Sequence, residues 1–71
     1  MMGFFRRQEE QVVVRILRGR YAAQGSALPS DPELQQKASA IVDEAHIILR
    51  RRGGNLVDIV KELAADWVKK R

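Results

Sequence analysis

The chain has 71 residues, of which 45% are hydrophobic and 31% are charged, and its formal net charge is +4. This composition is typical of a globular domain rather than a disordered chain. It contains no cysteine and only one histidine, which excludes a disulfide framework and a zinc site built from several such ligands. The apolar runs are too short for a transmembrane helix or for the core of a signal peptide. We therefore expect a single small domain over residues 1–71, located in the cytoplasm, with no metal and no cofactor.

Two clusters of turn-forming residues divide the chain into three segments with helical periodicity. Gly25, Pro29 and Pro32 surround the first break, and Gly53-Gly54 forms the second. No alternation of polar and apolar residues is long enough to indicate a strand. The periodicity predicts helices near residues 6–24, 32–52 and 55–70. Because the connections are short, we expect an all-α fold, either a three-helix bundle or a helical hairpin array, completed by dimerisation.

The first predicted helix has an unusually wide apolar arc. At 100° per residue it has two adjacent apolar sides, one with Phe5, Val12, Ile16, Gly19 and Ala23, the other with Val13, Leu17 and Tyr21. A helix with so wide an apolar arc is either central to its bundle or contacts a second partner. We expect that both sides cannot face the other two helices, and that the Val13-Leu17-Tyr21 side contacts a second copy. Gly19 would allow the backbones to approach closely at such a crossing.

The second and third predicted helices carry clearer start signals. Ser30 and Glu33 have the spacing of a capping box, Pro32 suits a first helical turn, and Asn55 is a favoured cap. Ile47 lies opposite the apolar seam of its helix and is expected to be exposed. The core is expected to contain Ile41, Ala45, Ile48, Leu49, Leu56, Val60, Leu63 and Trp67.

Arginines gather at the beginning of the chain and near the second break. If the first two helices pack antiparallel, these clusters would form one basic patch suited to a phosphate backbone, consisting of Arg7, Arg15, Arg18, Arg50, Arg51 and Arg52. Helix dipole complementarity explains the same arginines without any ligand. A helix-turn-helix is disfavoured, because the polar face of the third predicted helix begins with acids, namely Asp58 and Glu62.

Other chemistries find less support in the residues. Asp43-Glu44-Ala45-His46 spells a helicase motif, but the chain has no phosphate-binding loop to accompany it. Asp43 and His46 have a spacing used in metal-binding bundles, but the further ligands are missing, so we expect a surface histidine near Asp43. Ser39 and His46 share one helix with no evident pocket, so we expect no enzyme and no small-molecule substrate. The apolar and basic start of the chain supports at most weak membrane contact.

The sequence therefore predicts a non-enzymatic helical protein-interaction module that associates with itself or with a partner helix through its first helix. The expected interaction surface consists of Phe5, Val12, Val13, Ile16, Leu17, Tyr21 and Ile47. The alternative is a small basic protein that contacts nucleic-acid phosphates weakly and without sequence specificity, through the arginine clusters.

Overall fold

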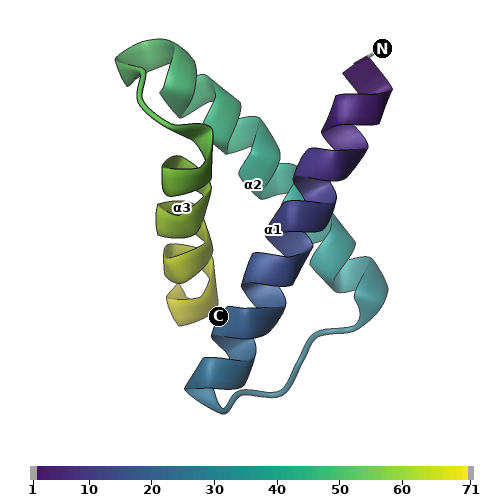
Figure 1. Cartoon of the computed structure of the whole chain (residues 1–71). Helices are drawn as coiled ribbons and strands as arrows, with labels where there is room; N and C mark the ends of the chain where they lie inside the picture. The colour runs from purple at the N-terminus through teal and green to yellow at the C-terminus, as the bar shows by residue number, and fades with distance from the viewer. Residues whose placement is uncertain (1, 71) are drawn as a thin grey trace.

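A computed structural model describes the backbone of residues 2–70 and the side chains of residues 6–69. It contains three helices, α1 (Met2–Gln24), α2 (Asp31–Arg52) and α3 (Leu56–Lys70), each packed against the other two (Figure 1). No strand occurs within residues 2–70. The predicted all-α, three-helix fold is confirmed, although α1 begins at Met2 rather than at Arg6. None of the helices described is long and apolar enough to cross a membrane.

Local side-chain chemistry sets the ends of α2 and the start of α3. The Ser30 hydroxyl accepts from the amide of Glu33 at 3.4 Å, and the Glu33 carboxylate accepts from the amide of Ser30 at 3.3 Å. This reciprocal pair is the predicted capping box. Gly53, with φ of 71°, ends α2 by donating its amide to the carbonyl of Leu49. At the start of α3, the Asn55 side chain accepts from the amide of Val57 at 2.8 Å.

Helix α1 runs antiparallel to α2 and in the same direction as α3. Arg6, near the start of α1, contacts Asp43 at 2.8 Å, whereas Arg18, near its end, contacts Asp31 at the start of α2 at 2.9 Å. Figure 1 shows that α1 and α3 both descend in the view, while α2 rises in the opposite direction and crosses behind α1. The Arg50–Arg52 end of α2 therefore lies about one helix length from Arg18.

The core forms where the apolar stripes of all three helices meet. Of the core predicted from sequence, Ile41, Ala45 and Val60 are buried, whereas Ile48, Leu49, Leu56, Leu63 and Trp67 are half-buried and pack around its edge. The difference arises because three crossing helices can fully bury only one row of residues in each apolar stripe, and the rows on either side remain partly exposed. Among the side chains of residues 6–69, the buried ones are Val13, Leu17, Tyr21, Leu34, Ala38, Ile41, Val42, Ala45, Ile59, Val60, Ala64 and Val68.

The orientation expected for α1 is wrong. Val13, Leu17 and Tyr21, which were expected to face a second copy, are 1%, 0% and 7% exposed and belong to the core of this chain. Helix α1 contacts both α2 and α3, so a single stripe along it is covered by both neighbours. The adjacent side, which includes Val12 and Gly19, is therefore the one that borders solvent.

Candidate functional site

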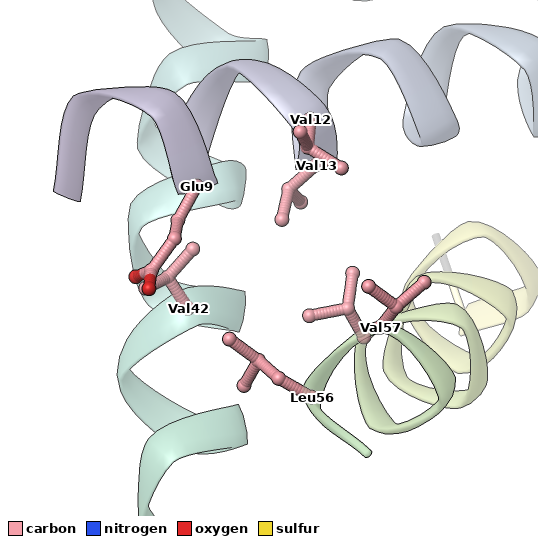
Figure 2. Close-up of a pocket in the computed structure, with 7 residues that line it drawn as sticks. Glu9, Val12, Val13, Val42, Leu56 and Val57 are labelled. Atoms are coloured by element: carbon pink, nitrogen blue, oxygen red, sulfur yellow. The ribbon is translucent and has the colours of Figure 1, made fainter. Parts of the chain in front are cut away.

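An apolar hollow lies where the middle of α1 approaches the first turn of α3 (Figure 2). Its volume is about 90 Å³. Val12 and Val57 stand on opposite walls and remain 44% and 48% exposed, so the mouth of the hollow is apolar. The lining consists of Glu9, Val12 and Val13 from α1, Val42 from α2, and Leu56, Val57 and Val60 from α3.

A second hollow, of about 410 Å³, lies between the same two helices farther along the chain. Small residues create it: Gly19 and Ala23 on α1 face Ala65 on α3, and a Cβ added at Gly19 would meet nothing within 4 Å. Arg20, Gln24, Val68 and Lys69 complete its lining. Gly19 in a helix interior costs roughly 1 kcal/mol relative to alanine, and no close contact with the described residues requires a glycine there.

Both hollows lie between α1 and α3, and we refer to the two together as the α1–α3 groove. On α1 the residues Val12, Ile16 and Arg20 follow one another at four-residue intervals and so lie along one side of the helix. On α3 the corresponding row is Val57, Lys61, Ala65 and Lys69. Val12 and Arg20 are just over two helical turns apart, which places the hollows roughly 12 Å from each other along α1.

The rim of the α1–α3 groove is basic. Arg20 and Lys69 line the second hollow, while Arg15 and Lys61 line neither hollow but lie one helical turn after Val12 and Val57. All four are exposed, and no ion pair within the described side chains involves any of them. The one carboxylate that lines either hollow belongs to Glu9, and it contacts Nε2 of His46 at 2.9 Å. The acids Asp58, Glu62 and Asp66 form the adjacent row of α3, turned farther from α1. The groove therefore combines apolar walls with positive charge.

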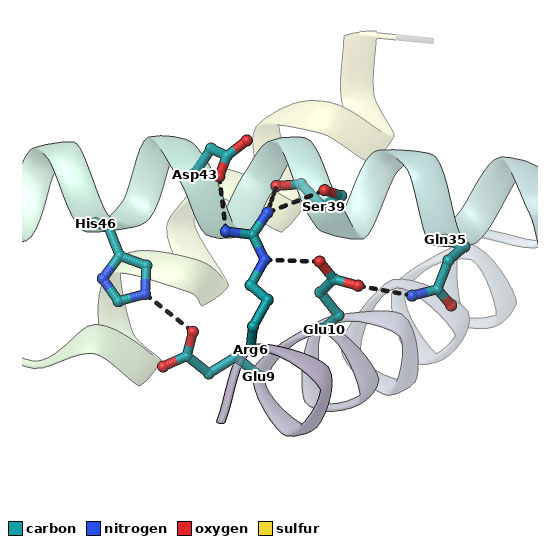
Figure 3. Close-up of polar contacts among 7 residues, drawn as sticks. All are labelled: Arg6, Glu9, Glu10, Gln35, Ser39, Asp43 and His46. Atoms are coloured by element: carbon teal, nitrogen blue, oxygen red, sulfur yellow. Dashed lines mark hydrogen bonds and ion pairs between the residues drawn. The ribbon is translucent and has the colours of Figure 1, made fainter. Parts of the chain in front are cut away.

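A polar network on the other side of α1 joins this helix to α2 (Figure 3). The Arg6 guanidinium contacts Glu10 at 2.6 Å and Asp43 at 2.8 Å, and it donates to the Ser39 hydroxyl at 3.0 Å. Gln35 donates to the second oxygen of Glu10 at 2.9 Å. The hydrogen bond from Arg6 lowers the pKa of the Glu10 carboxyl, and the hydrogen bonds to Asp43 and Glu10 raise the pKa of Arg6. This network fixes the position of α1 on α2.

The same network corrects the expected surroundings of the single histidine. His46 contacts Glu9 of α1, while Asp43, the expected neighbour of His46, is paired with Arg6. The antiparallel packing brings these α1 side chains to α2, and sequence spacing within α2 alone does not show them. Within the side chains that the structure describes, no group of three acidic, histidine or cysteine residues is placed to hold a metal ion.

The arginines predicted to form one phosphate-binding patch are divided between distant places. Arg18 is paired with Asp31 at the beginning of α2, and Arg52 is paired with Glu62 of α3 at 3.2 Å. These sites are separated by the whole of α2, which has 22 residues and therefore spans roughly 33 Å. Arg7, Arg15, Arg50 and Arg51 are exposed. Arg15 and Arg18 thus form no single patch with the arginines that end α2.

The residues predicted as an interaction surface also separate into groups. Val12 lines the first hollow, Ile16 is half-buried and packs against the core, and Val13, Leu17 and Tyr21 lie in the core. Ile47 is 52% exposed, as expected, but it lines neither hollow of the groove. Phe5 lies outside the side chains that the structure describes.

Sequence reasoning missed Val57, the α3 wall of the first hollow. The sequence did contain a signal for it: Val57 is an apolar residue just outside the apolar stripe of the third helix, and Lys61 follows it four residues later on the same side. Only the packing of α3 beside α1 brings Val57 opposite Val12. Comparison with known protein families, with curated proteins and with solved structures finds no match to this chain.

Proposed function

We propose that the protein is a non-enzymatic helical interaction module that binds a partner helix in the α1–α3 groove. The observation that carries this proposal is the pair Val12 and Val57, which face each other across an apolar hollow while remaining nearly half exposed. An amphipathic helix that lays its apolar side into such a groove is a recurring mode of recognition. It would cover valines that this chain leaves in water.

Gly19 gives the proposal independent support. A partner backbone that approaches α1 closely at the second hollow would need a position without a side chain, and Gly19 provides one on the exposed side of the helix. Self-association through the Val13-Leu17-Tyr21 side, as predicted from sequence, is not possible because that side is buried in the core, so a second copy would have to use the Gly19 side instead. A second copy of the chain is therefore the alternative occupant, and the experiment below distinguishes it.

The test is a selection from a displayed library of amphipathic helical peptides, with flanking positions randomised around a fixed apolar stripe. Val57→Asp is the disabling variant: Val57 is half exposed and lies in the first turn of α3, where an acidic residue is compatible with the helix dipole. Ile47→Asp is the matched control, since Ile47 is similarly exposed but lies outside the groove.

The expected result is a set of peptides that bind the wild type and the Ile47→Asp variant but lose binding to Val57→Asp. Light scattering over a concentration series examines self-association in the same three proteins. A dimer that dissociates only in Val57→Asp would identify a second copy as the occupant of the groove. The proposal is wrong if the wild type stays monomeric and no selected peptide depends on Val57.

A second candidate function, weak binding to nucleic acid, is favoured by the exposed Arg50 and Arg51, for which the described side chains provide no ion pair. Each phosphate contact contributes about 0.9 to the log–log salt dependence of binding to duplex DNA. Replacing both arginines with glutamine should therefore reduce the slope by about 2, measured by fluorescence anisotropy over a salt series. An unchanged slope would remove this candidate.

A further inference from the structure

We infer that the partner is an acidic amphipathic helix, with an aliphatic anchor in the first hollow and carboxylates along its flanks. This inference rests on the proposed function of the α1–α3 groove and adds the chemistry of the occupant. Its basis is the exposed positive charge: Arg20 and Lys69 line the second hollow, and Arg15 and Lys61 lie one helical turn after the valines Val12 and Val57 of the first. Complementary charge around an apolar contact steers encounter and selects among partners that could fill the same groove.

The shape of the first hollow limits the anchor. An engineered cavity of about 150 Å³ accommodates a benzene ring, and the first hollow, at about 90 Å³, is smaller. Valines and leucine dominate its walls, and its single carboxylate is in contact with His46. A branched aliphatic side chain therefore fits better than an aromatic ring or a charged group.

The distance between the hollows sets the spacing of the anchors. Because they are roughly 12 Å apart along α1, a helix lying in the groove would reach them with residues seven or eight positions apart. The second hollow is bordered by Arg20 and Lys69, so the partner residue there sits among cations. An acidic side chain beside a small residue suits that place.

The same rim disfavours a second copy of this chain. In a symmetric dimer the groove would meet its own copy, because a two-fold axis places the same surface on both subunits. Arg15, Arg20, Lys61 and Lys69 of the two copies would then be brought together, and like charges placed opposite each other oppose association. The same positive charges would attract an acidic helix and repel a second copy of this chain.

The test uses three synthetic peptides of about 18 residues, long enough to populate a helix. They share one apolar stripe, with a leucine for the first hollow and an alanine seven residues later for the second, and they carry glutamate, glutamine or lysine at the flanking positions. Fluorescence anisotropy measures their affinities at low salt. Three or four exposed charge pairs should make the glutamate peptide bind about tenfold more tightly than the glutamine peptide. The lysine peptide should bind most weakly.

Two charge-reversal variants complete the experiment. Arg20→Glu with Lys61→Glu reverses part of the rim, while Arg50→Glu with Arg51→Glu changes the net charge equally at a site outside the groove. The first pair brings the charge of the four rim positions from +4 to 0, so it should abolish the preference for the glutamate peptide, whereas the second pair should leave the order unchanged. Circular dichroism verifies that both variants fold. If the Arg20→Glu, Lys61→Glu variant is unfolded, the order of the three peptide affinities for the wild type is the test of the acidic partner.

The possible failures are distinguishable. If the glutamate and glutamine peptides bind equally and Val57→Asp abolishes both, the groove binds helices but the acidic partner is wrong. A wild-type dimer that Val57→Asp dissociates also overturns the acidic partner, since a second copy then occupies the groove. If no peptide shows binding that depends on Val57 and the chain is monomeric, the proposed function falls together with this inference.

Discussion

The orientation of α1 can be tested with two neighbouring residues of the same type. Val12 and Val13 are adjacent in α1, yet Val12 is 44% exposed and Val13 is 1% exposed. Truncating each to alanine removes the same atoms and changes helix propensity by the same amount. The difference between Val12→Ala and Val13→Ala therefore reports which side of α1 is buried in this chain.

The magnitude follows from the burial of each side chain. Val13→Ala removes two buried carbons, worth about 0.8 kcal/mol each, and leaves a cavity that adds about 1 kcal/mol. The better helix propensity of alanine returns about 0.5 kcal/mol, so the net loss of unfolding free energy is about 2 kcal/mol. Val12 is about half exposed, so Val12→Ala loses only about half of the transfer free energy and leaves no cavity. After the gain in helix propensity is subtracted, the loss of unfolding free energy is below about 0.5 kcal/mol.

Urea and thermal denaturation, both followed by circular dichroism at several protein concentrations, measure the unfolding free energy and the Tm of both variants. A domain of this size loses about 4–8 °C in Tm for each kcal/mol, so Val13→Ala should melt roughly 8–16 °C below the wild type. Val12→Ala should stay within a few degrees. Equal losses for the two variants, or a larger loss for Val12→Ala, would refute the orientation of α1. The double change Val13→Glu with Leu17→Lys should unfold the chain rather than yield a folded monomer.

Three further predictions concern α1 and the edge of the core. Because the pKa of Glu10 is lowered, the native state releases this carboxyl proton more readily than the unfolded chain does. The ionised Glu10 therefore stabilises the fold fully above the ordinary pKa of 4.5, and this stabilisation is lost as pH falls through the lower pKa of the folded state. Unfolding measured between neutral and acidic pH should thus show a shallower acid loss in Arg6→Gln than in the wild type or Arg7→Gln. Gly19→Ala should raise Tm by about 4–8 °C, because it removes roughly 1 kcal/mol of helix cost where a Cβ has room; a lower Tm would show that a neighbour occupies this space. Trp67→Ala should lower the unfolding free energy measured with urea by about 3 kcal/mol, the low end for a large aromatic residue. The reason is that Trp67 is half-buried and the Lys37 ammonium lies 5.7 Å from the centroid of its ring. An unchanged urea midpoint would contradict the packing of α3 on α2.

Sequence alone determined the features of this protein that depend on neighbours within a few residues. The capping box of Ser30 and Glu33, the glycine that ends α2 and the asparagine that starts α3 all involve contacts across at most four residues. Helical periodicity also identified the seam of α2, from Leu34 to Ala45, since residues three and four apart share a side whatever the helix packs against. These local rules correctly predicted three helices.

Only the tertiary structure decided which apolar side of α1 enters the core. Periodicity assigned Val12 and Val13 to adjacent sides, but it carries no information about the angle at which α1 crosses α2 and α3. That crossing buries Val13, leaves Val12 opposite Val57, and brings Glu9 to His46 and Arg6 to Asp43. These contacts join residues more than thirty positions apart, so they depend on how the three helices fit together and not on the spacing within any one of them.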